Sequence, residues 1–157
     1  LYLVTPAGGE AHQLSTKIGY VTSATVSPDG RRIAIVADGE VYVAPLIAAA
    51  EGLTIGSSPR QLLAGSLSVA GAAWISDAWL YVGGTRSGNA AMWRVSADGV
   101  VANDETGSLK GQVVTDIVSW PGIGSRLDVI VYTPQAPYFL LTTGLSSTGY
   151  QAPFYGG

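Results

Sequence analysis

The sequence has no cysteine and only one histidine among its 157 residues, which removes several kinds of chemistry. A chain without cysteine forms no disulfide, no thiolate zinc site and no thiol nucleophile. His12 follows Glu10 beside a pair of glycines, whereas a metal site needs three or four ligands. We therefore predict that His12 is a solvated hairpin residue and that the chain has no metal ligands.

Charge is also scarce. Charged residues make up 12% of the chain, about half of the ~25% that is usual, and the mean hydropathy is positive. These values suggest that much of the surface contacts protein rather than water. The eight lysines and arginines are scattered and the net charge is -3, so we expect no nucleic-acid partner.

Long hydrophobic runs are missing as well. The longest apolar stretches, such as 41–50 and 129–132, fall well short of the roughly 20 residues that span a bilayer. The first residues read as a β-strand and not as a charged segment followed by an apolar one. We expect any export signal to lie outside this sequence.

A short β-prone phrase recurs along the chain. It occupies 20–26, 68–74 and 114–120, so that its last positions are 48 and then 46 residues apart. Each copy is followed by two further β-rich runs with a turn or loop between them. A repeat of this length with this order of strands is typical of propeller blades. The sequence therefore predicts an all-β fold, a partial β-propeller of about three and a half four-stranded antiparallel blades.

The repeat also suggests how the chain is divided. We expect a fragment of one propeller domain over 1–157, with an outer half-blade at 1–18, blades at 19–65 and 66–111, and a blade with a C-terminal tail at 112–157. Blades bury their apolar faces only against neighbouring blades, and three and a half of them cannot close a ring. We therefore predict that the isolated chain self-associates.

Several segments between the strands carry turn signals. The Ser-Pro-Asp-Gly run at 27–30 and the pair Asp38-Gly39 are typical of tight turns. Residues 47–52, in an insertion within the outer hairpin of the first blade, are compatible with a helical turn. The glycine-rich segment 83–89 predicts an irregular loop on a rim of the ring.

Motifs for catalysis are incomplete. The segment 144–149 resembles a G-x-S-x-G nucleophile motif but has an extra residue, and 122–127 lacks the third glycine of a dinucleotide-binding pattern. Asp104 and Glu105 are adjacent, so in a strand they would face opposite sides, and we assign them to a solvated loop. We predict no catalytic residues and no cofactor-binding residues.

Aromatic and turn residues remain as candidates for packing and recognition. Trp74 and Trp120 hold matching places in the repeat, which predicts that they fill the gaps between blades. Trp79 falls at the turn position that Arg31 holds in the first blade. Its side chain is predicted either to contact a partner or to be partly buried under a neighbouring loop. The candidate protein-contact residues, chosen because they occupy turns at the rims, are Arg31, Trp79, Arg86, Asn89 and Gln135.

The segment 24–34 resembles the S-P-D-G-x-x-[ILV]-[AV] signature of TolB-like and related propellers. Together with its continuation at 36–46, the Trp120-Pro121 pair and Tyr138, it resembles the C-terminal propeller of the LpqB family of actinobacterial lipoproteins. That resemblance implies a parent with a lipidated N-terminal cysteine and a GerMN-type domain, displayed outside the cytoplasmic membrane. Contact with the membrane would be made only through this lipid anchor, which lies outside the sequence.

The resemblance also implies a partner, the extracellular domain of the MtrB sensor histidine kinase. This kinase belongs to a two-component system in envelope homeostasis and cell division. The function predicted is therefore a non-catalytic, protein-binding propeller without a cofactor. The alternative is an accessory propeller of a prolyl-oligopeptidase-like hydrolase whose catalytic domain is missing from this sequence.

Overall fold

The computed structural model describes residues 1–3, 11–14, 18–49, 52–56, 58–65 and 67–107, and the strands at 113–120, 126–133 and 136–144. Side chains are described up to residue 107, except those of residues 3 and 12. The strands are β1 (Tyr2–Leu3), β2 (His12–Gln13), β3 (Val21–Val26), β4 (Arg32–Ala37), β5 (Glu40–Ala49), β6 (Gly52–Ile55), β7 (Arg60–Leu62), β8 (Ser68–Ser76), β9 (Trp79–Arg86), β10 (Asn89–Ser96), β11 (Ala102–Asp104), β12 (Val113–Trp120), β13 (Arg126–Thr133) and β14 (Ala136–Gly144).

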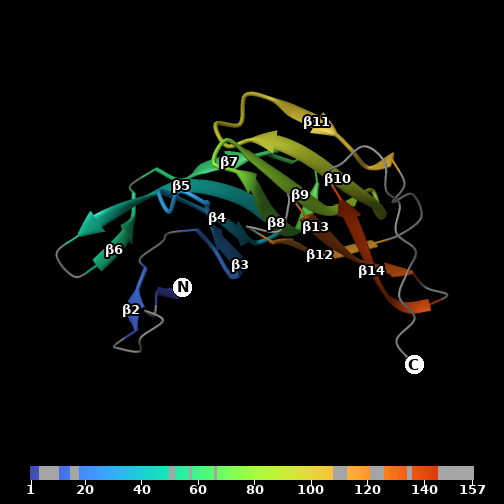
Figure 1. Ribbon diagram of the computed structural model, residues 1–157, viewed down its shortest axis with the longest axis horizontal. Helices are drawn as coiled ribbons and strands as arrows, with labels where there is room; N and C mark the ends of the chain where they lie inside the picture. The colour runs from blue at the N-terminus through green and yellow to red at the C-terminus, as the bar shows by residue number, and fades with distance from the viewer. Residues whose placement is uncertain are drawn as a thin grey trace.

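These strands form antiparallel sheets that follow one another in chain order (Figure 1). The first sheet has the order β3-β4-β5, and β7 pairs with the same strand β5. The second has the order β8-β9-β10-β11, and the third contains β12-β13-β14. No α-helix occurs in the described part of the chain. The predicted all-β fold is confirmed, and the arrangement is that of a partial β-propeller.

Two equivalent hairpins join the second and third strands of the first two sheets. Asp38 and Gly39 have φ angles of 51° and 75°, and Ser87 and Gly88 have φ angles of 52° and 77°. Positive φ at both central residues defines the primed turn whose twist matches that of the flanking strands. The tight turn predicted at Asp38-Gly39 is confirmed.

The irregular loop predicted at 83–89 is wrong. Strand β9 continues through Gly83 and Gly84 to Arg86, and β10 begins at Asn89. Gly84 is needed for close packing within the sheet, because a Cβ at this position would overlap the backbone carbonyl oxygen of Ser68. A strand glycine of this kind permits a close backbone approach and does not end the strand.

The helical turn predicted within 47–52 is also wrong. Strand β5 continues to Ala49, and its second half pairs with β6, so that Leu46 faces Ile55 and Ala49 faces Gly52. The residues 53–55 supply a β-prone partner, and pairing with them outweighs the helix propensity of the alanines. The resulting hairpin is the insertion in the first blade, and it projects from the first sheet (Figure 1).

A hydrophobic core lies between the first and second sheets. It is built largely from Ala34, Val36, Val41, Val43, Leu62, Trp74, Leu80, Val82 and Val95. Trp74 is only 3% exposed, and its Nε1 donates a hydrogen bond of 3.0 Å to the carbonyl oxygen of Thr25 in the neighbouring sheet. The predicted role of Trp74 as a filler between blades is confirmed, whereas the side chain of Trp120 lies outside the described residues.

The opposite face of the first sheet is buried as well. Ile33, Ile35 and Ala37 of β4 form a second core with Leu14, and Leu1 packs against it. The backbone N–H of Leu14 donates to the carbonyl oxygen of Leu1 at 2.9 Å, which holds the two ends of the N-terminal segment together. The first sheet is thus covered on both faces, as an inner blade of a propeller is.

Candidate functional site

The turns between strands fall into two groups at opposite ends of the sheets. Because successive strands run antiparallel, the first and third turns of a sheet lie at one end and the second turn lies at the other. The turns 27–31, 77–78 and 97–101 form one end, which we call the Trp79 rim. The turns 38–39 and 87–88 form the other, which we call the Glu40 rim.

A Ser-x-Asp-Gly turn shapes the Trp79 rim. The hydroxyl of Ser27 donates to Oδ1 of Asp29 at 2.6 Å and accepts the backbone N–H of Arg32 at 2.9 Å. Asp29 also accepts the backbone N–H of Arg31 at 3.0 Å. These hydrogen bonds, first that from Ser27 and then that from Arg31, hold the pKa of Asp29 below its usual value.

The same turn occurs a second time, at 96–99. The hydroxyl of Ser96 donates to Oδ1 of Asp98 at 2.6 Å and accepts the backbone N–H of Val101 at 2.9 Å. The Ser96 hydrogen bond is the main reason why the pKa of Asp98 lies below its usual value. The sequence signal for this shared construction is the Ser-x-Asp-Gly pattern itself, which appears at both 27–30 and 96–99.

Neighbouring sheets are tied together at this rim. The carboxylate of Asp77, in the first turn of the second sheet, accepts the backbone N–H of Asp29 at 2.8 Å. Arg32 donates to the carbonyl oxygen of Asp77, and Arg60 donates in the same way to the carbonyl oxygen of Asp98. Each arginine of the first sheet thus holds a turn of the second sheet in place.

A groove of about 340 Å³ opens on the Trp79 rim. Its lining includes Arg32, Trp79, Val100 and Val101. Val100 is 76% exposed and Val101 is 43% exposed, and the guanidinium of Arg94 lies 5.3 Å from the centre of the Trp79 ring. Tryptophan and arginine are enriched in the cores of protein interfaces, and the exposed valines add apolar area beside them.

The structure divides the predicted contact residues between the two rims. Arg31 is exposed on the Trp79 rim, immediately before β4. Trp79 is partly buried on the same rim as the first residue of β9, which corresponds to Arg32 at the start of β4 and not to Arg31. Arg86 and Asn89 lie at the opposite end of the second sheet, and Gln135 lies outside the described residues.

Arg86 and Asn89 are engaged in contacts within the chain. Arg86 forms an ion pair with Asp104 at 3.1 Å, and its guanidinium lies 5.5 Å from the centre of the Trp93 ring. The side-chain amide of Asn89 donates to the carbonyl oxygen of Ser87 at 3.2 Å. These two residues therefore support the Glu40 rim, and they do not join Arg31 and Trp79 in one surface.

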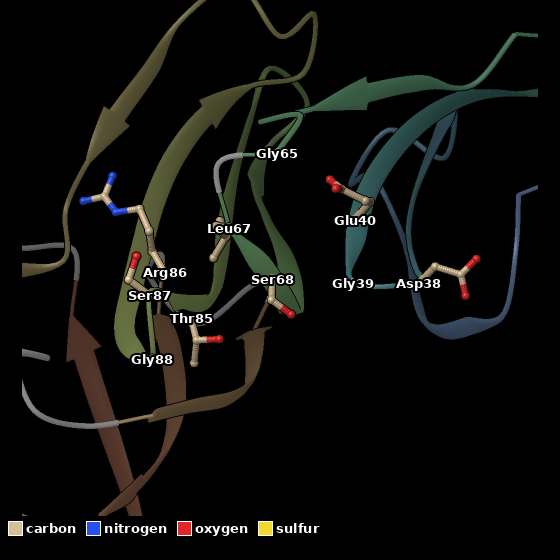
Figure 2. Close-up of a pocket in the computed structure, with 10 residues that line it drawn as sticks. All are labelled: Asp38, Gly39, Glu40, Gly65, Leu67, Ser68, Thr85, Arg86, Ser87 and Gly88. Carbon is tan, nitrogen blue, oxygen red and sulfur yellow. The ribbon is translucent and has the colours of Figure 1, made fainter.

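The Glu40 rim has its own groove, of about 530 Å³ (Figure 2). It is lined by polar and small residues, among them Glu40, Ser68, Thr85, Ser87 and Gly88. Sequence reasoning missed Glu40. The available signal was a single carboxylate directly after a tight turn, at the start of an otherwise apolar strand.

The carboxylates of Asp104 and Glu105 do not face a shared site. Asp104 is the last residue of β11, so its assignment to a loop is wrong. Its carboxylate accepts hydrogen bonds from Arg86 and from the Thr106 hydroxyl. The hydrogen bond from the Thr106 hydroxyl is the first cause of the lowered pKa of Asp104. Glu105 follows the strand and binds Arg94 at 3.1 Å and the Tyr81 hydroxyl at 2.8 Å. The two carboxylates therefore have separate partners.

The described residues contain no group of three or more histidine, cysteine or acidic side chains placed to hold a metal ion. Within the same part of the chain, no helix has the length and apolar character to cross a membrane. The side chain of His12 and the residues 145–149 lie outside the described residues.

The chain was compared with known protein families. The family model described as the lipoprotein LpqB beta-propeller domain matches residues 4–121. No curated protein matches the sequence.

Proposed function

Because the chain belongs to the family of LpqB-type lipoprotein β-propeller domains, we propose that it is a non-catalytic module that binds a protein partner. Within the parent lipoprotein, anchored by its lipid outside the cytoplasm, the partner is the extracellular domain of an MtrB-type sensor histidine kinase. Binding modulates a two-component system in envelope homeostasis and cell division. The partner and the location are taken from the family resemblance, and the match to the propeller family supports them over the hydrolase alternative.

The observation that carries the proposal is the composition and rigidity of the Trp79 rim. Trp79, Val100 and Arg32 line one groove and offer it an aromatic, an aliphatic and a cationic residue, and the exposed Arg31 precedes Arg32 in the chain. The turns at 27–30 and 96–99 are fixed by the Ser-x-Asp-Gly hydrogen bonds, and Asp77, two residues before Trp79, is bonded to the backbone N–H of Asp29. A surface that is ordered before binding loses less conformational entropy when the partner arrives.

The strands support the predicted division into blades. β1 and β2 fall within 1–18, β3 to β7 within 19–65, β8 to β11 within 66–111, and β12 to β14 within 112–157. We propose these ranges as the units of one propeller domain.

The proposal is tested by measuring the affinity of the 157-residue chain for the extracellular domain of the kinase. Replacing Trp79 or the exposed Val100, as Trp79→Ala and Val100→Asp, should weaken binding about tenfold or more, because central interface residues carry most of the binding energy. Asn89→Ala, on the opposite rim, is the matched control and should leave the affinity unchanged. Equal affinity of all three variants, or no binding by the unaltered chain, would contradict the proposal.

A further inference from the structure

The Glu40 rim carries negative charge that the described part of the chain does not compensate. Two ion pairs occur among the described residues, Arg86 with Asp104 and Arg94 with Glu105. Asp38 and Glu40, at the turn between β4 and β5, belong to neither. The carboxylate of Asp38 is nevertheless engaged, because its Oδ1 accepts the backbone N–H of Tyr20 at 3.1 Å. Among the carboxylates that the structure describes on this rim, Glu40 is therefore the one without a partner.

The environment of Glu40 is costly for a free carboxylate. The residue is partly exposed, but its Oε2 atom is buried and receives no hydrogen bond from the described residues. A buried charged oxygen that has lost its hydration is normally compensated by a donor or a cation. Figure 2 shows the Glu40 carboxylate pointing toward the side of Gly65 and Leu67, whereas that of Asp38 turns away.

The groove beside Glu40 has the size and the lining to accept a polar, positively charged group. Its volume is about 530 Å³, and the hydroxyl residues Ser68, Thr85 and Ser87 line it together with glycines. Arg86 borders the same groove, but its guanidinium is paired with Asp104 and points away from Glu40 (Figure 2). No cation of the described residues therefore occupies the place beside Glu40.

We propose that this groove binds a lysine or arginine side chain presented by a basic segment of a partner protein, with Glu40 as its anionic anchor. An ammonium or guanidinium group in the groove would form an ion pair with the Glu40 carboxylate, while the hydroxyl groups accept its N–H donors. An organic cation suits the site better than a divalent metal, because Ca²⁺ takes six to eight oxygen ligands and Glu40 is the one free carboxylate described here. This inference concerns the opposite rim and does not depend on the proposed function.

The test uses tetralysine amide as the probe, titrated into the 157-residue chain at low ionic strength and followed by calorimetry. Glu40→Gln should weaken binding about tenfold or more, because it removes the charge and keeps the size of the side chain. The matched control is Asp77→Asn on the Trp79 rim. It makes the same change in net charge, and its amide oxygen can still accept the Asp29 N–H, so the affinity should change less than twofold.

A second variant separates the groove from the overall charge. Thr85→Val removes a hydroxyl of the lining with little change of volume, and binding should weaken by roughly threefold while the net charge is unchanged. The melting temperature of Glu40→Gln should equal or exceed that of the unaltered chain, because an uncompensated charge has been removed. No binding of tetralysine amide, equal losses in Glu40→Gln and Asp77→Asn, or displacement of the peptide by millimolar Ca²⁺ would overturn the proposal.

Discussion

At the scale of single residues, the Tyr81 hydroxyl shows how burial and a neighbouring charge combine. It donates to Glu105 at 2.8 Å, and Glu105 is also paired with Arg94 at 3.1 Å. Burial is the first cause that raises the pKa of Tyr81 to about 12, followed by the hydrogen bond to Glu105 and its negative charge. The folded state therefore favours the neutral phenol more than the unfolded chain does.

This shift predicts a loss of stability at high pH. The contribution of Tyr81 is fully present below pH 10, the ordinary pKa of the phenol, and is lost as the pH rises through about 12. Tyr81→Phe should remove this part of the decline. The check is the melting temperature between pH 8 and 12, with Tyr2→Phe, an exposed tyrosine, as the control. An equally steep decline in Tyr81→Phe and in the unaltered chain would contradict the assignment.

The candidate contact residues show what a sequence can reveal at this scale. The location of Arg31 and Trp79 on one rim follows from the repeat, and the alternation of strand direction is enough to separate them from Arg86. The ion pair of Arg86 with Asp104 depends on the register between β10 and β11, where Arg94 faces Asn103 and Trp93 faces Asp104. No local sequence pattern determines that register, so the ion pair between Arg86 and Asp104 could not be predicted.

At the scale of elements, Gly84 of β9 allows this strand to approach β8 closely. Val69 faces Gly84 and Gly71 faces Gly83, with a register shift between the two pairs. The close approach at Gly84 leaves no room for a side chain. The glycine-rich composition of 83–89 suggests a loop, but residues 83–86 belong to a strand. Composition alone does not indicate that a glycine is needed because the neighbouring backbone is close.

Gly84→Ala should therefore destabilise the chain by about 3 kcal/mol or more, because the new methyl group overlaps the Ser68 carbonyl and forces the strands apart. Gly65→Ala is the matched control. Gly65 has a φ of 65° and open space around it, so Gly65→Ala should lower the free energy of unfolding by only the roughly 1–2 kcal/mol that a left-handed conformation costs an alanine. The measurement is the free energy of unfolding in urea. Equal losses in the two variants would show that the close approach is not the cause.

The strand order of each sheet could be predicted from the repeat, but the β5–β6 hairpin could not. Its alanines favour helix, whereas the pairing of Leu46 with Ile55 and of Ile47 with Thr54 favours strand. Intrinsic propensities are small compared with the gain from a partner strand. The partner strand β6 begins at Gly52, whose φ is 123°, and the composition of residues 47–49 does not indicate that this strand will pair with them.

At the scale of the whole molecule, stability comes from sheets covering one another. The first sheet is buried on one side by the second sheet and on the other by residues that include Leu14. Trp74 contributes both apolar area and the hydrogen bond to Thr25 across that interface. Such an array gains stability with each neighbour it acquires, because the free energy is approximately a sum over units and their interfaces.

We therefore predict that the 157-residue chain self-associates. Sedimentation velocity at tens of micromolar should show dimers or larger species, because three and a half blades cannot close a ring and an uncovered face would find another copy. Moderate urea, below the unfolding transition, should shift the distribution toward monomer by weakening apolar contacts. A monomer that persists across the concentration range would contradict the prediction.

Strand β9 runs from Trp79 to Arg86 and so connects the two ends of the second sheet. Eight residues in an extended strand cover about 23 Å between the first and last Cα atoms. A body docked beside Trp79 and one docked beside Thr85 would consequently not compete for space. If both proposed sites are occupied, this strand sets the distance between the two bound molecules, and a bend in it would alter the angle between them.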